Sequence, residues 1–122
     1  MELIYVCSRL KSDDEHSLKF NQAVAEAMCK LIFIESKGTA FPIAPHLYMP
    51  HFLDDNKEDE RAFACDIGIK TLMKCKKMSV VIVDGIISGG MLAEIYAAQQ
   101  ANIPIEYRWF TKDDMEAFIK YR

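Results

Sequence analysis

The chain has 122 residues, of which 51% are hydrophobic and 27% charged, a composition typical of one soluble globular domain. A formal net charge of −3 argues against binding to nucleic acid or to an anionic membrane surface. No apolar run approaches the roughly 18 residues of a membrane span, and the N-terminus lacks the basic start of a signal peptide. We therefore expect a single cytoplasmic domain over residues 1–122.

The cysteines and histidines show no pattern typical of a metal site. The four cysteines are Cys7, Cys29, Cys65 and Cys75. They form no CxxC pair, and free cysteine is usually buried, so we expect reduced and mostly buried thiols. The side chains of His46, His51, Asp54 and Asp55 lie close together in the sequence, but their spacing matches no known metal pattern. We predict neither a metal nor another cofactor.

Residues 3–7, LIYVC, form an apolar run that is typical of a buried strand. Ser8 and Arg9 follow at the carboxyl end of this strand, the position that faces a ligand in an open α/β sheet. A helix is predicted from the acidic residues 13–15 onward, and Gly38 is expected to stop it. Its apolar stripe consists of Phe20, Val24, Ala27, Met28 and Leu31.

Residues 40–44 predict a weaker strand, because Pro42 cannot donate a hydrogen bond to a central ladder. From Pro45 to Lys57 the sequence has neither helical nor strand periodicity, and a loop of this length is usually functional or disordered. Its large apolar residues are Leu47, Tyr48, Met49, Phe52 and Leu53. Such residues argue against disorder, and we expect them to form the interface of a homodimer or larger homo-oligomer close to the ligand pocket.

Residues 58–75 predict the next helix, acidic at its start and basic at its end, as the helix macrodipole favours. Residues 79–83, SVVIV, form a β-branched run without polar alternation, which is typical of a strand buried on both faces. Ser88, Gly89 and Gly90 then interrupt regular structure, and a helix is predicted from Met91 onward.

Residues 103–107 predict the last strand, placed near an edge by Pro104, and Thr111 with Asp114 resembles a capping box for a short C-terminal helix. Strands thus alternate with helices at intervals of about 30 residues, which predicts a parallel sheet with right-handed crossovers. The expected fold is α/β: a small doubly wound sheet of about four strands.

Glu94 is the strongest candidate for chemistry, because we expect it in the first turn of the helix that follows the central strand. The helix dipole would hold such a carboxylate ionised. An ionised carboxylate can attack an anomeric carbon and form a glycosyl-enzyme intermediate. Acidic residues are also common in first turns simply because they stabilise the helix, so the local sequence leaves both interpretations open.

Other candidates lie at the same predicted end of the sheet. Asp84 can bind a ribose hydroxyl or a base edge, although Asp-Gly is also a common turn pair. Arg9 with Ser8 can hold a phosphate, and a surface arginine is an equally good interpretation. Tyr5 carries a hydroxyl that needs a partner if it is buried. The pair Gly89-Gly90 lets a backbone approach a ligand but lacks the GxGxxG spacing of a dinucleotide site.

Three segments resemble the nucleoside 2-deoxyribosyltransferase-like superfamily, especially its branch of small proteins. They are residues 4–8 (IYVCS), 42–48 (PIAPHLY) and 87–95 (ISGGMLAEI), and the likeness extends from Leu3 to Tyr107. The resemblance implies a flavodoxin-like (Rossmann-like) sheet of about four to five strands flanked by helices. It also implies a pocket for nucleosides or nucleotides, in an assembly where a neighbouring subunit completes the pocket.

The resemblance assigns roles to individual residues. Glu94 matches the nucleophile that attacks the deoxyribose anomeric carbon, and Tyr5 matches the tyrosine that positions it. Ser8 and Ser88 match phosphate-binding positions of members that act on nucleoside monophosphates. The other substrate contacts expected in the matching segments are His46, Tyr48, Gly89, Gly90 and Met91.

Two features depart from the family pattern. The family usually shows a serine-proline-aromatic-arginine or glycine-serine-x-arginine run after the first strand, whereas here Arg9 directly follows Ser8. The second catalytic aspartate of the family has no clear counterpart; Asp84 is the best positional match and Asp66 the next.

The sequence therefore predicts cleavage or transfer of the N-glycosidic bond of a deoxynucleoside or nucleoside monophosphate, as in a deoxyribosyltransferase or deoxynucleotide N-glycosidase. One alternative is a non-catalytic protein that senses or sequesters a nucleotide, and another is a structural or assembly protein. The sequence indicates neither the base nor whether water or a second base accepts the sugar.

Overall fold

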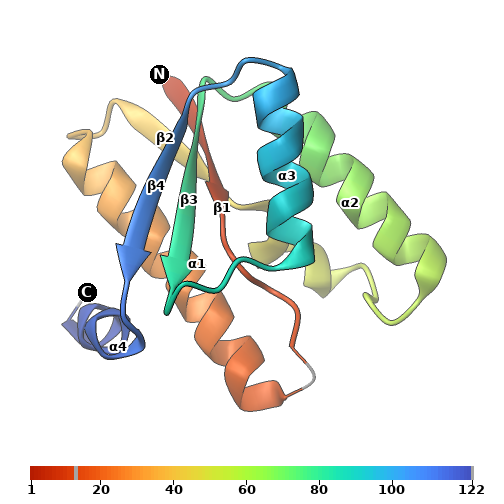
Figure 1. Cartoon of the computed structure of the whole chain (residues 1–122), viewed down its shortest axis with the longest axis horizontal. Coiled ribbons are helices and arrows are strands. Elements are labelled where there is room, and N and C mark those ends of the chain that lie inside the picture. The colour runs from red at the N-terminus through yellow and green to blue at the C-terminus, as the bar shows by residue number, and fades with distance from the viewer. Residues whose placement is uncertain (13, 122) are drawn as a thin grey trace.

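One parallel four-stranded sheet lies between two layers of helices, and its strands are short apolar runs that alternate with these helices along the chain (Figure 1). The computed structural model describes residues 1–12 and 14–121. The elements are β1 (Glu2–Cys7), α1 (Glu15–Glu35), β2 (Ala40–Ile43), η1 (Pro45–Leu47), η2 (Met49–His51), α2 (Glu58–Leu72), β3 (Lys77–Val83), α3 (Gly89–Gln100), β4 (Ile105–Phe110) and α4 (Lys112–Tyr121). Asp13, one of the acidic residues expected before the first helix, lies outside the described residues.

The strand order is β2-β1-β3-β4, which confirms the predicted doubly wound α/β class. In this flavodoxin-like order the chain leaves β1 toward one edge of the sheet and later leaves β3 toward the other. The carboxyl ends of β1 and β3 therefore form the topological switch point, where open α/β sheets bind their ligands.

Helices cover both faces of the sheet, α1 and α4 on one side and α2 and α3 on the other (Figure 1). Alternate residues of β1 serve the two cores: Ile4 and Val6 pack toward α1, and Tyr5 and Cys7 toward α2 and α3. This two-sided burial explains why the strand sequences are apolar throughout rather than alternating.

The predicted helices and strands are present, with shifts of a few residues at their ends. The stripe of α1 is confirmed, since its residues are buried or partly buried, and Gly38 closes the helix with a φ of +80°. Helix α2 ends at Leu72 rather than at residue 75. Strand β4 begins at Ile105, just after Pro104, and so lies later than the predicted residues 103–107. The Asp114 N–H donates to Thr111 Oγ1 at 3.0 Å, half of the expected capping box.

The segment from Pro45 to Lys57 is more ordered than predicted, because it contains the two short 3₁₀ helices η1 and η2. Met49 is buried and Leu47 packs against the core on the α1 side. Tyr48 and Phe52 remain exposed, at 56% and 62% of their surface. The chain itself therefore covers part of the apolar set and leaves the rest at the surface, and the interface expected for these residues stays a prediction.

The cysteines are free, as predicted, with Cys7 and Cys75 buried but Cys65 exposed. Within residues 1–12 and 14–121 no group of three or more potential ligands is placed to hold a metal ion. Over the same residues, every helix is too short or too polar to cross a membrane.

Candidate active site

Tyr5 and Glu94, 89 positions apart in the sequence, form a hydrogen bond beneath α2 and α3. Tyr5 points from β1 to this face of the sheet, where only 1% of its surface is exposed, and its hydroxyl donates to Glu94 Oε2. Met91 and Ile95 on α3 pack into the same core and so turn the half-buried Glu94 toward β1. The structure thus brings together two of the three residues expected to be catalytic.

Gly68 on α2 completes this arrangement and is not among the residues predicted for the site. A Cβ atom at this position would lie 3.3 Å from the Tyr5 hydroxyl and 3.4 Å from Glu94 Oε2. The absence of a side chain at residue 68 therefore lets α2 pack closely against the pair, and a Cβ there would require its neighbours to shift by a few tenths of an ångström. A glycine inside a predicted helix costs about 1 kcal/mol relative to alanine, and this cost is the signal in the sequence that could have identified Gly68.

Burial controls the electrostatics of the pair. Removal from water raises the pKa of the Glu94 carboxyl, and the hydrogen bond from Tyr5 and the nearby Cys7 thiol partly oppose this rise. Burial, together with the nearby Glu94 charge, raises the pKa of Tyr5 far above its ordinary value, so the phenol remains a hydrogen-bond donor. A buried carboxyl with a raised pKa can serve as a nucleophile when ionised or as a general acid when protonated.

The position of Glu94 in its helix differs from the prediction. Helix α3 begins at Gly89 after the N-cap Ser88, and its first turn contains no acidic residue. Glu94 therefore lies in the second turn, where the effect of the helix dipole has largely fallen off. The first-turn position expected for Glu94 is therefore wrong, and burial, which raises the pKa of this carboxyl, has a larger effect on it than the helix dipole.

The start of α3 lies beside the end of β1, since Cys7 Sγ is 3.9 Å from the Met91 carbonyl oxygen. Ser88 Oγ accepts a hydrogen bond from the Met91 N–H at 3.2 Å and so caps the helix. Gly89 and Gly90 are exposed, and a Cβ atom on either would meet no other atom within 4 Å. The fold does not need glycine at these two positions, and the space in front of them is open to a ligand.

Ser8 and His46 form a second pair, with Ser8 Oγ 2.9 Å from His46 Nε2. Ser8 is buried at the end of β1, and His46 lies in η1 after β2. Burial lowers the pKa of His46 to about 4, so the imidazole is neutral at physiological pH. A neutral imidazole and a hydroxyl can each donate and accept hydrogen bonds to a polar ligand.

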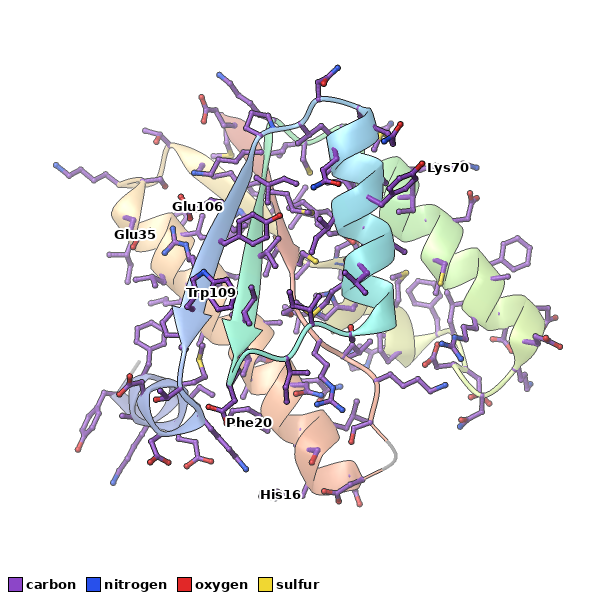
Figure 2. All side chains as sticks on the ribbon, in the orientation of Figure 1. His16, Phe20, Glu35, Lys70, Glu106 and Trp109 are labelled. Atoms are coloured by element: carbon purple, nitrogen blue, oxygen red, sulfur yellow. The ribbon has the colours of Figure 1, made fainter. Side chains whose placement is uncertain are left out.

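Arg9 and Asp84 lie on the other side of the sheet, around a cavity of about 270 Å³ that neither Tyr5 nor Glu94 lines. Lys112 and Phe20 also line it; Figure 2 labels Phe20 on α1. Asp84 Oδ1 accepts from the Lys112 N–H at 2.9 Å at the start of α4. Asp84 also has a φ of +53°, a left-handed conformation that aspartate tolerates in turns.

The remaining predicted positions, Tyr48 and Asp66, lie at the surface. Asp66, the second choice for a catalytic aspartate, forms an exposed ion pair with Lys70 on α2 at 2.9 Å. A larger cavity of about 650 Å³ lies between residues 10–12 and 50–56, and no predicted site residue lines it.

The fold and the placement of these side chains define an α/β protein with a polar site at the switch point of a flavodoxin-like sheet. Residues 2–108 match the family described as "Domain of unknown function (DUF7768)", and the chain belongs to this family. No curated protein matches the chain in sequence.

One solved structure with a similar fold is a 2-deoxyribosyltransferase from the psychrotolerant bacterium Bacillus psychrosaccharolyticus. The superposition has a TM-score of 0.64 and covers 88% of this chain and 72% of the enzyme, at 16% sequence identity. At this identity the likeness shows a shared fold.

Proposed function

We propose that the chain cleaves or transfers the N-glycosidic bond of a deoxynucleoside or its monophosphate, with Glu94 as nucleophile. The observation that carries the proposal is the buried hydrogen bond between Tyr5 and Glu94, close to the switch point of the sheet. The fold shared with a 2-deoxyribosyltransferase supports the same class of substrate.

In the proposed reaction one carboxylate oxygen of Glu94 bonds to the anomeric carbon of the sugar while the carbon–nitrogen bond to the base breaks. The bonding electrons leave with the base, which takes up a proton. Water or a second base then attacks the same carbon, and the Glu94 carboxylate is released. Tyr5 donates its proton to a hydrogen bond throughout, which fixes the orientation of the carboxylate and stabilises its ionised form.

The ligand in this proposal lies in front of the first residues of α3. Gly89 and Gly90 leave open space there, next to Ser88 and Met91. Ser88 Oγ accepts the capping hydrogen bond, and its hydroxyl proton remains available to a phosphate or sugar oxygen. The neutral His46 and Ser8 supply further polar contacts, and the exposed Tyr48 supplies an aromatic one. On this proposal Asp84 contacts ligand only in the cavity that it lines together with Arg9. One of its two carboxylate oxygens already caps α4.

A second candidate is a non-catalytic nucleotide-binding protein that senses or sequesters its ligand. The specific observation in its favour is that the Tyr5–Glu94 pair lies beneath α2 and α3 and outside the lining of both cavities described above. In either case the proposed partner is a nucleoside or nucleotide bound without a cofactor, by a cytoplasmic homo-oligomer.

The test is incubation of the pure protein with deoxynucleosides and their monophosphates, with chromatographic detection of free base. We expect release of base from at least one substrate, and a loss of at least about a thousandfold in Glu94→Gln, whose amide cannot act as a carboxylate nucleophile. Glu116→Gln is the matched control, because Glu116 is exposed on α4. Unchanged turnover in Glu94→Gln contradicts the assignment, and tight binding without base release favours the second candidate.

A further inference from the structure

Strand β4 forms an open edge of the sheet, and no described strand pairs with its outer side (Figure 1). On its inner side, the carbonyl oxygens of Pro104 and Phe110 accept hydrogen bonds from Met78 N–H and Asp84 N–H, each at 2.9 Å. Backbone groups of successive strand residues point to opposite edges. The N–H and C=O groups of the odd-numbered residues 105, 107 and 109 therefore point away from the sheet.

The side chains of β4 are sorted between the two faces of the sheet. Tyr107 and Trp109 lie beside Val80 and Ile82 on the α3 side, yet 43% and 65% of their surfaces are exposed. On the α1 side, Arg108 forms a bidentate ion pair with Glu35 at 2.6 and 3.1 Å, and its Nε donates to Glu106. Figure 2 labels Trp109, Glu106 and Glu35. The edge thus combines unpaired backbone groups, exposed aromatic rings and one charge of each sign.

The opposite edge of the sheet is protected from strand pairing. Thr39 C=O accepts from Glu2 N–H at 3.1 Å, so Ala40 and Pro42 direct their backbones outward from β2. Pro42 has no N–H, and β2 is only four residues long. Short strands and proline are common protections of an edge, and β4 has neither within its six residues.

We propose that β4 pairs antiparallel with β4 of a second copy of this chain, about a two-fold axis through Tyr107. In this register Tyr107 lies opposite its own copy, and residue 105 lies opposite residue 109 of the second copy. The outward N–H and C=O groups of all three odd-numbered residues then form hydrogen bonds. Glu106 lies opposite Arg108 of the second copy on the same face, a favourable cross-strand pair.

Charge selects this register over its neighbours. The outward residues are all odd-numbered, so the pairing can slip only in steps that keep odd residues opposite odd residues. A slip in one direction places Glu106 opposite its own copy, and a slip in the other places Arg108 opposite its own copy. Like charges directly opposite one another destabilise a sheet. The strand is therefore complementary to itself in the register centred on Tyr107, and this self-complementarity favours a second copy of the chain as the partner of this edge.

The first test is the mass of the full chain by sedimentation and light scattering over micromolar to submillimolar concentrations. We expect the wild type to approach twice its chain mass of 14.0 kDa, and Tyr107→Lys to remain monomeric, because it places two lysines face to face at the axis. Tyr121→Lys is the matched control, since Tyr121 is an exposed tyrosine on α4 rather than on β4, and we expect it to dimerise like the wild type.

The second test identifies the register and does not depend on a lysine variant that folds. In a Cys65→Ser background, which removes the exposed native thiol, Tyr107→Cys is expected to form a covalent dimer on mild oxidation. Residues in such a pair lie about 5.5 Å apart between Cα atoms, within the range of a disulfide. Trp109→Cys is expected to remain uncrosslinked, because its copy lies roughly 14 Å away along the strands.

Three results overturn the proposal: a monomeric wild type across the series, a dimer that Tyr107→Lys leaves intact, or crosslinking of Trp109→Cys as fast as Tyr107→Cys. A dimer that dissociates in Tyr48→Ser/Phe52→Ser but not in Tyr107→Lys assigns the interface to the loop of η1 and η2 instead. None of these results depends on turnover, so this proposal and the proposed activity can fail independently.

Discussion

The carboxyl ends of β1 and β3 present different chemistry on the two sides of the sheet. On the α2–α3 side, Tyr5 and Glu94 meet beneath helices, where burial shifts the pKa of both groups. On the α1 side, Arg9, Asp84 and Lys112 surround an open cavity and are exposed to water. The first side suits a reactive carboxyl, whereas the second suits recognition of a charged or polar group. Depth below the helices, rather than position along a strand, therefore separates the two kinds of site.

The largest expected effect comes from filling the space beside the buried pair. Gly68→Leu introduces a side chain where a Cβ alone already lies 3.3 Å from the Tyr5 hydroxyl. We expect the free energy of unfolding to fall by about 1–3 kcal/mol and base release to fall at least about a hundredfold. Urea unfolding and the chromatographic assay measure the two effects. Ala62→Leu, on the exposed face of the same helix, controls for the added volume, and equal activity in both variants argues against tight packing at Gly68.

The second prediction concerns His46, which lies in η1, largely removed from water and without a compensating charge in its hydrogen bond to Ser8. Its pKa is about 4 in the folded chain against an ordinary value of 6.5, so the unfolded state binds a proton more readily between these values. Stability is therefore complete above pH 6.5 and is lost as the pH falls toward 4, by up to about 3 kcal/mol. Urea unfolding at several pH values measures this loss. His46→Gln is expected to flatten this part of the profile, and an unchanged slope would refute the explanation.

Removing the hydroxyl of Tyr5 is expected to have a smaller effect on stability. In Tyr5→Phe the Glu94 carboxylate loses its donor, and we expect a loss of about 1–3 kcal/mol of stability at neutral pH. The pKa of Glu94 rises further, because burial is less opposed. A carboxyl with a raised pKa is best tolerated when protonated. The stability gap to the wild type therefore widens as the pH rises through the raised pKa values of Glu94, and it narrows again as the pH falls toward 4.5.

The rate profile of the same variant distinguishes two roles for Glu94. If Glu94 is the nucleophile, base release rises as the carboxyl ionises, and the acid limb moves to higher pH in Tyr5→Phe. A rate that instead falls as the carboxyl ionises identifies a general acid. Tyr121→Phe, at an exposed tyrosine on α4, is the control for loss of a hydroxyl.

The smallest expected effect lies on the open side of the sheet. If one ligand spans both sides, with its sugar at Glu94 and its phosphate at Arg9, then Arg9→Ala weakens a monophosphate about tenfold, or about 1.4 kcal/mol. The affinity for the deoxynucleoside is expected to stay unchanged, and titration calorimetry measures both constants. Lys30→Ala on the exposed surface of α1 is the control for charge. Equal loss for both ligands shows that Arg9 does not bind the phosphate.

The sequence determined the fold class and most elements, because periodicity and helix caps are local properties. Apolar runs without alternation marked β1 and β3 as central strands, and the proline in β2 and the one before β4 correctly indicated the two edges. The residues 45–57 were less predictable. Their turns are 3₁₀ helices that depend on packing of Leu47 and Met49 against the rest of the chain.

Only the tertiary structure decided which candidates meet. The family resemblance paired Tyr5 with Glu94, and their contact follows from the way β1 and α3 pack. Asp84 directly follows β3 and was expected to join this pair, but its carboxylate instead caps α4 on the other side of the sheet. The role of Gly68 also required three elements to meet. Contacts, burial and pKa shifts depend on residues that are distant in the sequence, whereas the patterns of strands and helices depend on residues that are close in the sequence. The sequence therefore determined the elements, and the packing of α2 and α3 on the sheet decided the site.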